Sequence, residues 1–165
     1  MEHSRKESTF NKTNCRKYVI FSLALFFVPS LLWGALITDV GPDGVLTLED
    51  GKQVSLAGIE LDRSGVSVLR VLVIRRDAKV EILQAARDHK GREYAYVSLK
   101  AKFLDFPFGP GGVAAEEDVL INRFLVALGA ARVDDAQIFS KKEEFLEVQE
   151  QAKRSGEGIW SYERS

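Results

Sequence analysis

The stretch DHKGREYAYV, residues Asp88 to Val97, decides how this chain folds, because it joins a polar turn directly to an alternating strand. Gly91 supplies the conformational freedom that such a turn needs. Arg92 follows it at the point where the turn meets the sheet. A guanidinium fixed at that point is suited to binding a phosphate, so Arg92 is the first candidate site residue.

Alternating segments on both sides of this stretch predict a strand-rich first half. Asp50-Gly51 is typical of a tight hairpin turn. Ser64 is suited to cap a short apolar helix over residues 65–76. Five strands with a helix between the third and the fourth predict a five-stranded OB-fold β-barrel. The predicted strands are residues 36–40, 45–49, 53–60, 79–84 and 93–99.

The second half predicts two more helices, which makes the fold class α+β with about three helices packed on the barrel. Residues 120–128 form a short helix that ends at Gly129. Residues 141–155 form a longer helix that Gly156 and Gly158 terminate. The segment between the barrel and these helices is rich in Pro and Gly and predicts a loop.

The N-terminal residues 1–35 predict an export or anchoring signal ahead of a folded domain of residues 36–165. No charged residue occurs from Tyr18 to Thr38, and a leader rich in Lys and Arg precedes this run. A cleaved signal peptide would use Tyr18 to Phe27 as its apolar core. A retained signal anchor would use nearly the whole run as a transmembrane helix. Either alternative leaves the leader in the cytoplasm and places the domain outside it, anchored to the membrane or secreted into the periplasm or medium.

The predicted exported part is acidic and cannot form a disulfide. Residues 1–35 hold five Lys and Arg and two Asp and Glu, so 18 basic and 22 acidic residues remain, a formal charge of −4. The single cysteine, Cys15, lies in the leader. Because nucleic-acid affinity rests largely on cations that neutralise phosphates, this charge disfavours a nucleic-acid partner.

Four segments together resemble the thermonuclease, or staphylococcal-nuclease-like, family. The resemblance implies the same OB barrel with helices and extends from Ala35 to Tyr162. It also implies a calcium ion held by carboxylates, a Glu general base and two Arg side chains that stabilise the pentavalent phosphate. The segments are LEDGKQVSLAGIEL (Leu48 to Leu61), GREYAYV (Gly91 to Val97), INRFLVALGAARV (Ile121 to Val133) and SGEGIW (Ser155 to Trp160).

Most of the catalytic positions that the resemblance implies are substituted. Gly44-Val45 stands where the family has Asp-Thr after a Gly, with Asp43 one place early. Ser55 replaces the first Arg, Glu60 replaces a metal-binding Asp, and Arg63 replaces the general base. An Arg cannot accept a proton at neutral pH. Only Arg92 matches, which leaves Arg92 as the catalytic candidate and Glu60 with Asp43 as the metal candidates.

Two further features bear on partners. Phe103, Phe106 and Phe108 lie in the Pro- and Gly-rich segment. They form either a patch for a protein partner or the membrane surface, or the closure of one end of the barrel. His89 lies in the polar turn beside Asp88 and is interpreted as a surface residue.

Three functions remain open. The first is an exported or membrane-anchored thermonuclease-like domain that is catalytically degenerate and acts as a binding or scaffold module without a cofactor. The second is a calcium-dependent phosphodiesterase, a nuclease with a site rebuilt around Arg92 and Glu60. The third is a nucleic-acid-binding OB module.

Overall fold

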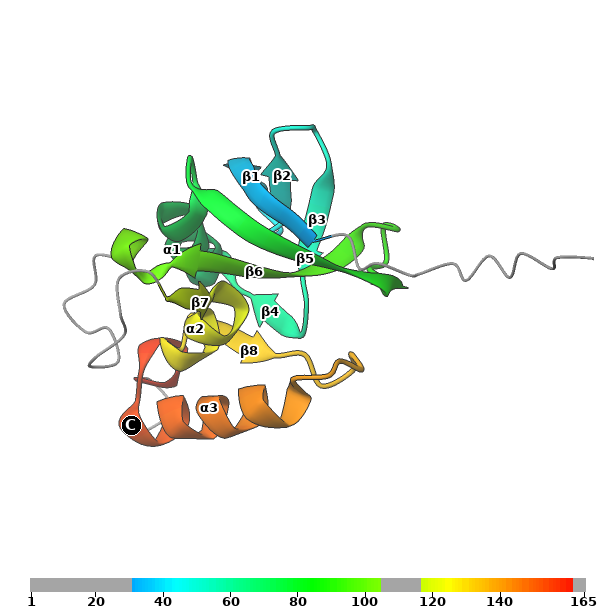
Figure 1. Ribbon diagram of the computed structural model, residues 1–165. Coiled ribbons are helices and arrows are strands. Elements are labelled where there is room, and N and C mark those ends of the chain that lie inside the picture. The colour runs from blue at the N-terminus through cyan, green and yellow to red at the C-terminus, as the bar shows by residue number, and fades with distance from the viewer. Residues whose placement is uncertain (1–30, 105–116, 162–165) are drawn as a thin grey trace, which may run out of the picture.

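The computed structural model describes residues 31–104 and 117–161 (Figure 1). Its elements in chain order are β1 (Leu31–Val40), β2 (Leu46–Leu48), β3 (Gln53–Leu56), β4 (Ile59–Leu61), α1 (Arg63–Val73), β5 (Asp77–Arg87), β6 (Glu93–Lys100), the 3-10 turn η1 (Ala101–Phe103), β7 (Asp118–Leu120), α2 (Ile121–Ala127), β8 (Ala131–Val133), α3 (Lys142–Ser155) and the 3-10 turn η2 (Gly158–Ser161).

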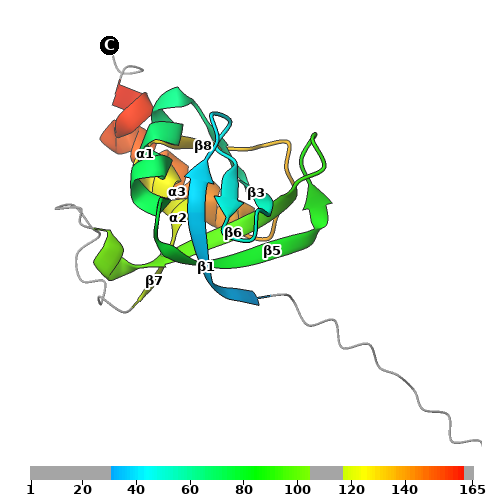
Figure 2. The ribbon, with the colours of Figure 1, turned by 90° about the horizontal axis from the view of Figure 1, so that it is seen from above.

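Five of the strands close into a barrel. Antiparallel pairing joins β3, β2, β1, β5 and β6 in that order, and β3 then pairs with β6 in parallel, with Val54 opposite Glu93. Figure 2 shows β1 crossing β5, with α1, α2 and α3 gathered on one side of β1. The closure confirms the predicted α+β fold with a five-stranded OB barrel.

The predicted third strand, residues 53–60, is interrupted, which corrects that interpretation. β3 ends at Leu56, and Gly58 has a φ of +76°, a conformation that changes the direction of the chain. β4 then pairs with β8, with Glu60 opposite Arg132. A side chain at Gly58 would meet the ring of Phe139 at 2.5 Å. The close packing of the loop between β8 and α3 therefore also requires glycine here.

Asp62, rather than the predicted Ser64, caps α1. Its carboxylate accepts a hydrogen bond from the backbone N–H of Gly65 at 2.7 Å, and Ser64 Oγ donates to the same oxygen at 2.7 Å. The helix ends at Val73, short of the predicted Arg76. Beyond the helix, Arg75 has a φ of +59°, so the chain changes direction there. The N–H of Arg75 donates to the carbonyl of Ile37 on β1.

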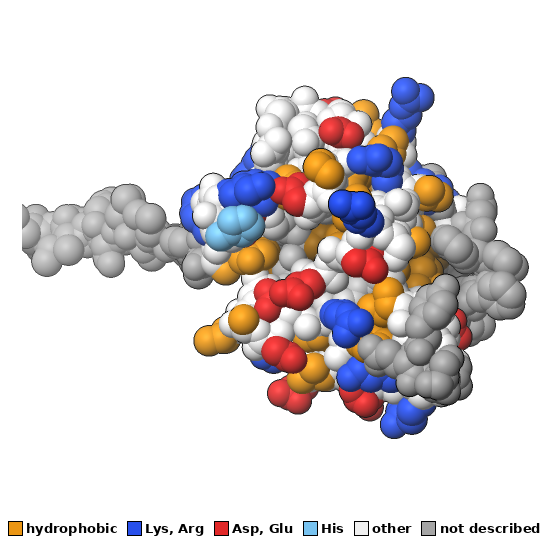
Figure 3. Space-filling model, turned by 180° about the vertical axis from the view of Figure 1, so that it is seen from behind, with side chains coloured by type: hydrophobic (Ala, Val, Ile, Leu, Met, Phe, Trp, Pro, Cys, Tyr) orange, Lys and Arg blue, Asp and Glu red, His pale blue; other side chains and the backbone are white. Residues whose placement is uncertain are grey.

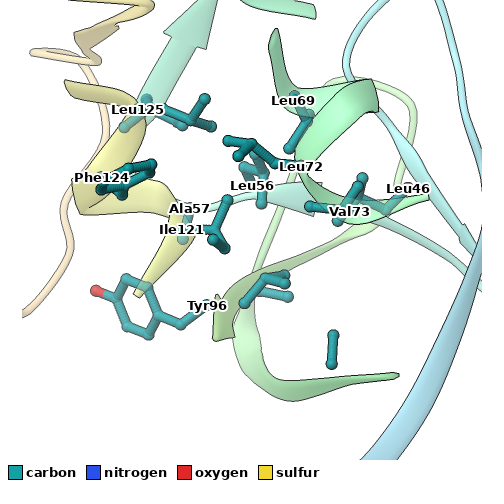
Figure 4. Packing of buried hydrophobic residues seen from close by; sticks show 14 of the residues in the cluster. Leu46, Leu56, Ala57, Leu69, Leu72, Val73, Tyr96, Ile121, Phe124 and Leu125 are labelled. Carbon is teal, nitrogen blue, oxygen red and sulfur yellow. The ribbon is translucent and has the colours of Figure 1, made fainter. Parts of the chain in front are cut away.

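The core is one cluster of buried side chains that extends from the barrel strands to the three helices. Figure 4 shows Leu69 and Leu72 of α1 pointing toward Leu56, Ile121 and Leu125, and all five are buried. Full burial of one such side chain contributes about 1.5–3 kcal/mol. α1 has only 11 residues and is too short to be stable alone, so this contact holds it in place.

A buried amide ties α2 to the barrel. Asn122 is fully buried and accepts a hydrogen bond from the N–H of Val97 at 3.0 Å. Its amide nitrogen donates to the carbonyls of Ala57 and Ala95 at 3.0 and 3.1 Å. One side chain therefore connects the helix to β6 and to the break after β3.

The C-terminal segment is locked against the end of α2. α3 ends at Gly156, which adopts a φ of +67°, as the sequence predicts. The N–H of Ile159 in η2 donates to the carbonyl of Gly129 at 2.9 Å. Trp160 is buried, with the guanidinium of Arg132 4.5 Å from its ring centroid.

Most of the predicted signal segment, residues 1–30, lies outside the described residues. β1 begins at Leu31, so the last residues of the uncharged run belong to a barrel strand. Within residues 31–104 and 117–161, no helix is both long and apolar enough to span a bilayer.

Candidate functional site

Arg92 lies between the β5–β6 turn and the first residue of β6, as the sequence predicts. The turn carboxylate of Asp88 holds it from two sides. Oδ2 of Asp88 accepts from Nε of Arg92 at 2.6 Å, and Oδ1 accepts from the backbone N–H of Arg92 at 2.9 Å. The side chain of Asp88 is 5% exposed and that of Arg92 is 16% exposed. The orientation of the guanidinium is therefore set by a partly buried ion pair.

Ser55 belongs to the same network. Its hydroxyl donates to Oδ2 of Asp88 at 2.7 Å across the parallel β3–β6 junction. Ser55, which the resemblance places at the position of an arginine, thus supports the carboxylate that orients Arg92. The barrel closure brings these side chains together.

Asp43 contacts the other side of Arg92. Its Oδ2 accepts from NH1 of Arg92 at 2.9 Å and from Nζ of Lys90 at 3.2 Å. Asp43 lies in the turn between β1 and β2, where Gly44 has a φ of +77° and packs against Leu61. Together with Asp88, four side chains from two hairpins therefore form one ion cluster.

The titration behaviour of this cluster follows its contacts. The hydrogen bond from Arg92, and a weaker one from Lys90, lower the pKa of Asp43 from 3.8 to about 2. Burial acts to raise the pKa of Asp88, but hydrogen bonds from Ser55 and Arg92 outweigh it and bring that pKa well below its usual range. Burial also acts to lower the pKa of Arg92, and its two carboxylate partners reverse this and raise it. All three groups are charged at neutral pH.

A surface cavity of about 340 Å³ opens beside the cluster. Asp43, Lys90 and Arg92 line one part of it. The other lining residues are Asp39, Gly41, Pro42, Val45, Thr47 and Gln53. The cavity therefore joins the charged cluster to polar groups from β1, β2 and β3.

The second metal candidate lies outside this cavity. Glu60 is exposed on β4 and is absent from the cavity lining. Arg63, which the resemblance places at the position of the general base, is the exposed first residue of α1. The structure thus places Asp43 against Arg92 and places Glu60 on another element.

The donor set does not fit a calcium ion. Calcium takes six to eight oxygen ligands. Gly44, at the position that the resemblance implies for a metal carboxylate, has no side chain, and Oδ2 of Asp43 already binds two cations. No group of three or more His, Cys, Asp or Glu side chains able to hold a metal occurs within residues 31–104 and 117–161.

Two other predicted features are placed only in part. His89 is exposed in the β5–β6 turn. Figure 3 shows one face of the molecule, on which Asp and Glu side chains are interspersed among Lys and Arg side chains. Phe103 ends η1, whereas Phe106 and Phe108 lie outside the described residues.

A larger cavity, of about 570 Å³, lies away from the cluster between α1, the α2–β8 turn and η2. It holds none of the predicted site residues.

Sequence reasoning also missed the roles of Asp88, Ser55 and Lys90. An Asp four residues before Arg92 in a turn is a usable signal for Asp88, because such side chains often bond to nearby backbone N–H groups.

Comparison with known proteins agrees with this geometry. The family model described as staphylococcal nuclease homologue matches residues 63–162, a range that includes Arg92, α2, α3 and η2. A search of curated proteins found no match. Because the family model covers more than half of the chain, the protein belongs to the staphylococcal nuclease homologue family.

Proposed function

We propose that this domain is a catalytically degenerate staphylococcal nuclease homologue that acts as a binding or scaffold module. The observation that carries the proposal is the state of Arg92, whose guanidinium is bound by two carboxylates, Asp43 and Asp88. A catalytic arginine must instead direct its donors to the place where charge develops on the substrate.

The remaining machinery supports the same proposal. Hydrolysis in this family, as the resemblance implies, needs a metal and a base to supply the nucleophile. Gly44, Ser55 and Arg63 occupy the positions implied for a metal ligand, an arginine and the base. None of the three can take over the role, and the hydroxyl of Ser55 is already bonded to Asp88.

A nuclease with a rebuilt site is the second candidate, because the cavity of about 340 Å³ beside Arg92 offers room for a ligand. Such a site would need Glu60 or other acids to move toward the cavity. A nucleic-acid-binding module has less support, since the part after residue 35 carries a formal charge of −4.

Nucleotide release from single-stranded DNA and RNA tests the proposal. The full chain, solubilised in a non-ionic detergent, is assayed with calcium and with chelator, beside Arg92→Ala and the control Arg87→Ala. Arg87 lies in the same hairpin, with its side chain 57% exposed and paired with Glu93. We expect no release above the chelator control. Calcium-dependent release that Arg92→Ala abolishes and Arg87→Ala preserves would overturn the proposal and favour the nuclease.

The proposal includes a location outside the cytoplasm, anchored or secreted. It is supported by the Lys- and Arg-rich leader followed by the uncharged run from Tyr18 to Thr38. Alkaline phosphatase fused after Ser165 is active only when exported. We expect activity in a bacterial host and its loss when Leu23 and Phe26 are both replaced by Arg. An inactive fusion with the natural sequence would contradict export.

A further inference from the structure

One carboxylate oxygen, Oδ2 of Asp43, receives two cations, NH1 of Arg92 at 2.9 Å and Nζ of Lys90 at 3.2 Å. Charged donors that converge in this way on one oxygen also bind phosphate and sulfate oxygens in proteins. We propose that the Asp43 carboxylate makes an autoinhibitory contact, in which it fills and blocks an oxyanion site formed by Arg92 and Lys90. The inference goes beyond the proposed function, since it concerns binding alone and holds whether or not the domain hydrolyses anything.

The two carboxylates on Arg92 are not equivalent. Asp88 is 5% exposed and its oxygens also accept from Ser55 Oγ and the N–H of Lys90. Asp43 is 38% exposed. Removal of Asp88 would disturb the buried network, whereas Asp43 faces solvent at the edge of the turn. Asp43 is therefore the partner that an external anion can replace while Asp88 keeps the guanidinium in place.

The surroundings can accept such an anion. Asp43, Lys90 and Arg92 all line the cavity of about 340 Å³. This volume is on the order of ten times the ~30 Å³ that a water molecule occupies in the liquid. Thr47 and Gln53, also in the lining, offer neutral hydrogen-bond donors. Space and donors are thus present once the carboxylate is removed.

Protonation does not release the contact under ordinary conditions. The pKa of Asp43 is about 2, because Arg92 and Lys90 stabilise its charged form. The carboxylate therefore stays ionised at any physiological pH. Only a competing anion, or a movement of the β1–β2 turn, frees the two cations.

The test is binding of inorganic phosphate to the full chain in a phosphate-free, non-ionic detergent, measured by isothermal titration calorimetry at low ionic strength. Asp43→Asn removes the charge and keeps the size. The control, Asp50→Asn, makes the same change of charge in the next hairpin turn, where Asp50 bonds to the N–H of Lys52. Asp43→Asn/Arg92→Gln removes the guanidinium as well. Asp43→Ser provides a second variant with a residue that turns favour.

We expect phosphate to bind Asp43→Asn and Asp43→Ser at least tenfold more tightly than the natural chain. The gain should vanish in the double variant and be absent in Asp50→Asn. Affinity unchanged in both Asp43 variants would overturn the inference. So would an equal gain in Asp50→Asn, which would indicate only a general effect of net charge, or a gain that survives the loss of Arg92.

Discussion

Nε of Arg92 lies 2.6 Å from Oδ2 of Asp88, and this partly buried pair lies within the β5–β6 turn. Asp88 also accepts hydrogen bonds from Ser55 and from two backbone N–H groups of its own turn. The Asp88 carboxylate that orients the candidate residue Arg92 therefore also stabilises the turn.

Asp88→Asn should destabilise the fold by about 3 kcal/mol, because it leaves the charge of Arg92 without its buried partner. Urea unfolding monitored by tryptophan fluorescence measures the change. Asp50→Asn serves as the control, since Asp50 also bonds to the N–H two residues on but is exposed and makes no ion pair with an arginine. Equal effects of the two substitutions would refute a special role for the Arg92–Asp88 pair.

Stability should fall as the pH decreases from about 4 toward 2. Asp43 and Asp88 have folded pKa values below their ordinary ones, so each favours folding above the unfolded pKa. That contribution is lost as the pH falls through the folded pKa. Carbon-detected NMR titration should place the pKa of Asp43 at about 2 and, in Arg92→Gln, nearer to 3.8. A pKa that Arg92→Gln leaves in place would show that Arg92 does not cause the shift.

Asn122→Ala should cost about 3 kcal/mol. The substitution removes three hydrogen bonds and leaves the N–H of Val97 and the carbonyl of Ala57 without this partner in the core, whereas the carbonyl of Ala95 still accepts from the N–H of Ala57. The exposed Gln151→Ala on α3 is the control and should change the free energy of unfolding by less than about 0.5 kcal/mol. Both are measured by urea unfolding. A small effect at Asn122 would mean that water replaces the lost amide.

Gly129→Ala should be far more destabilising than Gly51→Ala. Both glycines have positive φ, +61° and +80°, and an alanine there costs about 1–2 kcal/mol from the backbone alone. A methyl group at Gly129 would also overlap the carbonyl of Glu157, whereas the space around Gly51 is open. The steric part should add about 1–3 kcal/mol. Thermal unfolding compares them, and equal melting temperatures would argue against a tight lock between α2 and η2.

The parts of the fold that local patterns determine were predictable. Asp50-Gly51 indicated the β2–β3 hairpin, and Gly129 and Gly156 indicated the ends of α2 and α3. The pairing of β4 with β8 was not predictable in this way, because Ile59 and Val133 are far apart in the sequence and each strand has only three residues. A local pattern also gives no sign that Gly58 packs against the ring of Phe139, which is far away in the sequence.

The candidate site also has one part that was predictable from the sequence and one part that was not. Arg92 was identifiable, since its turn and its strand are contiguous in the sequence. Its restraint by Asp43 and the link from Ser55 depend on the closure of the barrel, which brings the first hairpin and β3 beside the β5–β6 turn. Long-range contacts of this kind decide whether the guanidinium of Arg92 can direct its N–H donors to a ligand.

The parallel β3–β6 junction also bears on solubility. The β3–β6 pairs cover the edges of β3 and β6 at which an open sheet would allow another chain to add a strand. Among the described strands outside the barrel, β4, β7 and β8 have three residues each, too few to template much intermolecular pairing. A substitution that opens the junction would therefore be expected to promote aggregation as well as unfolding.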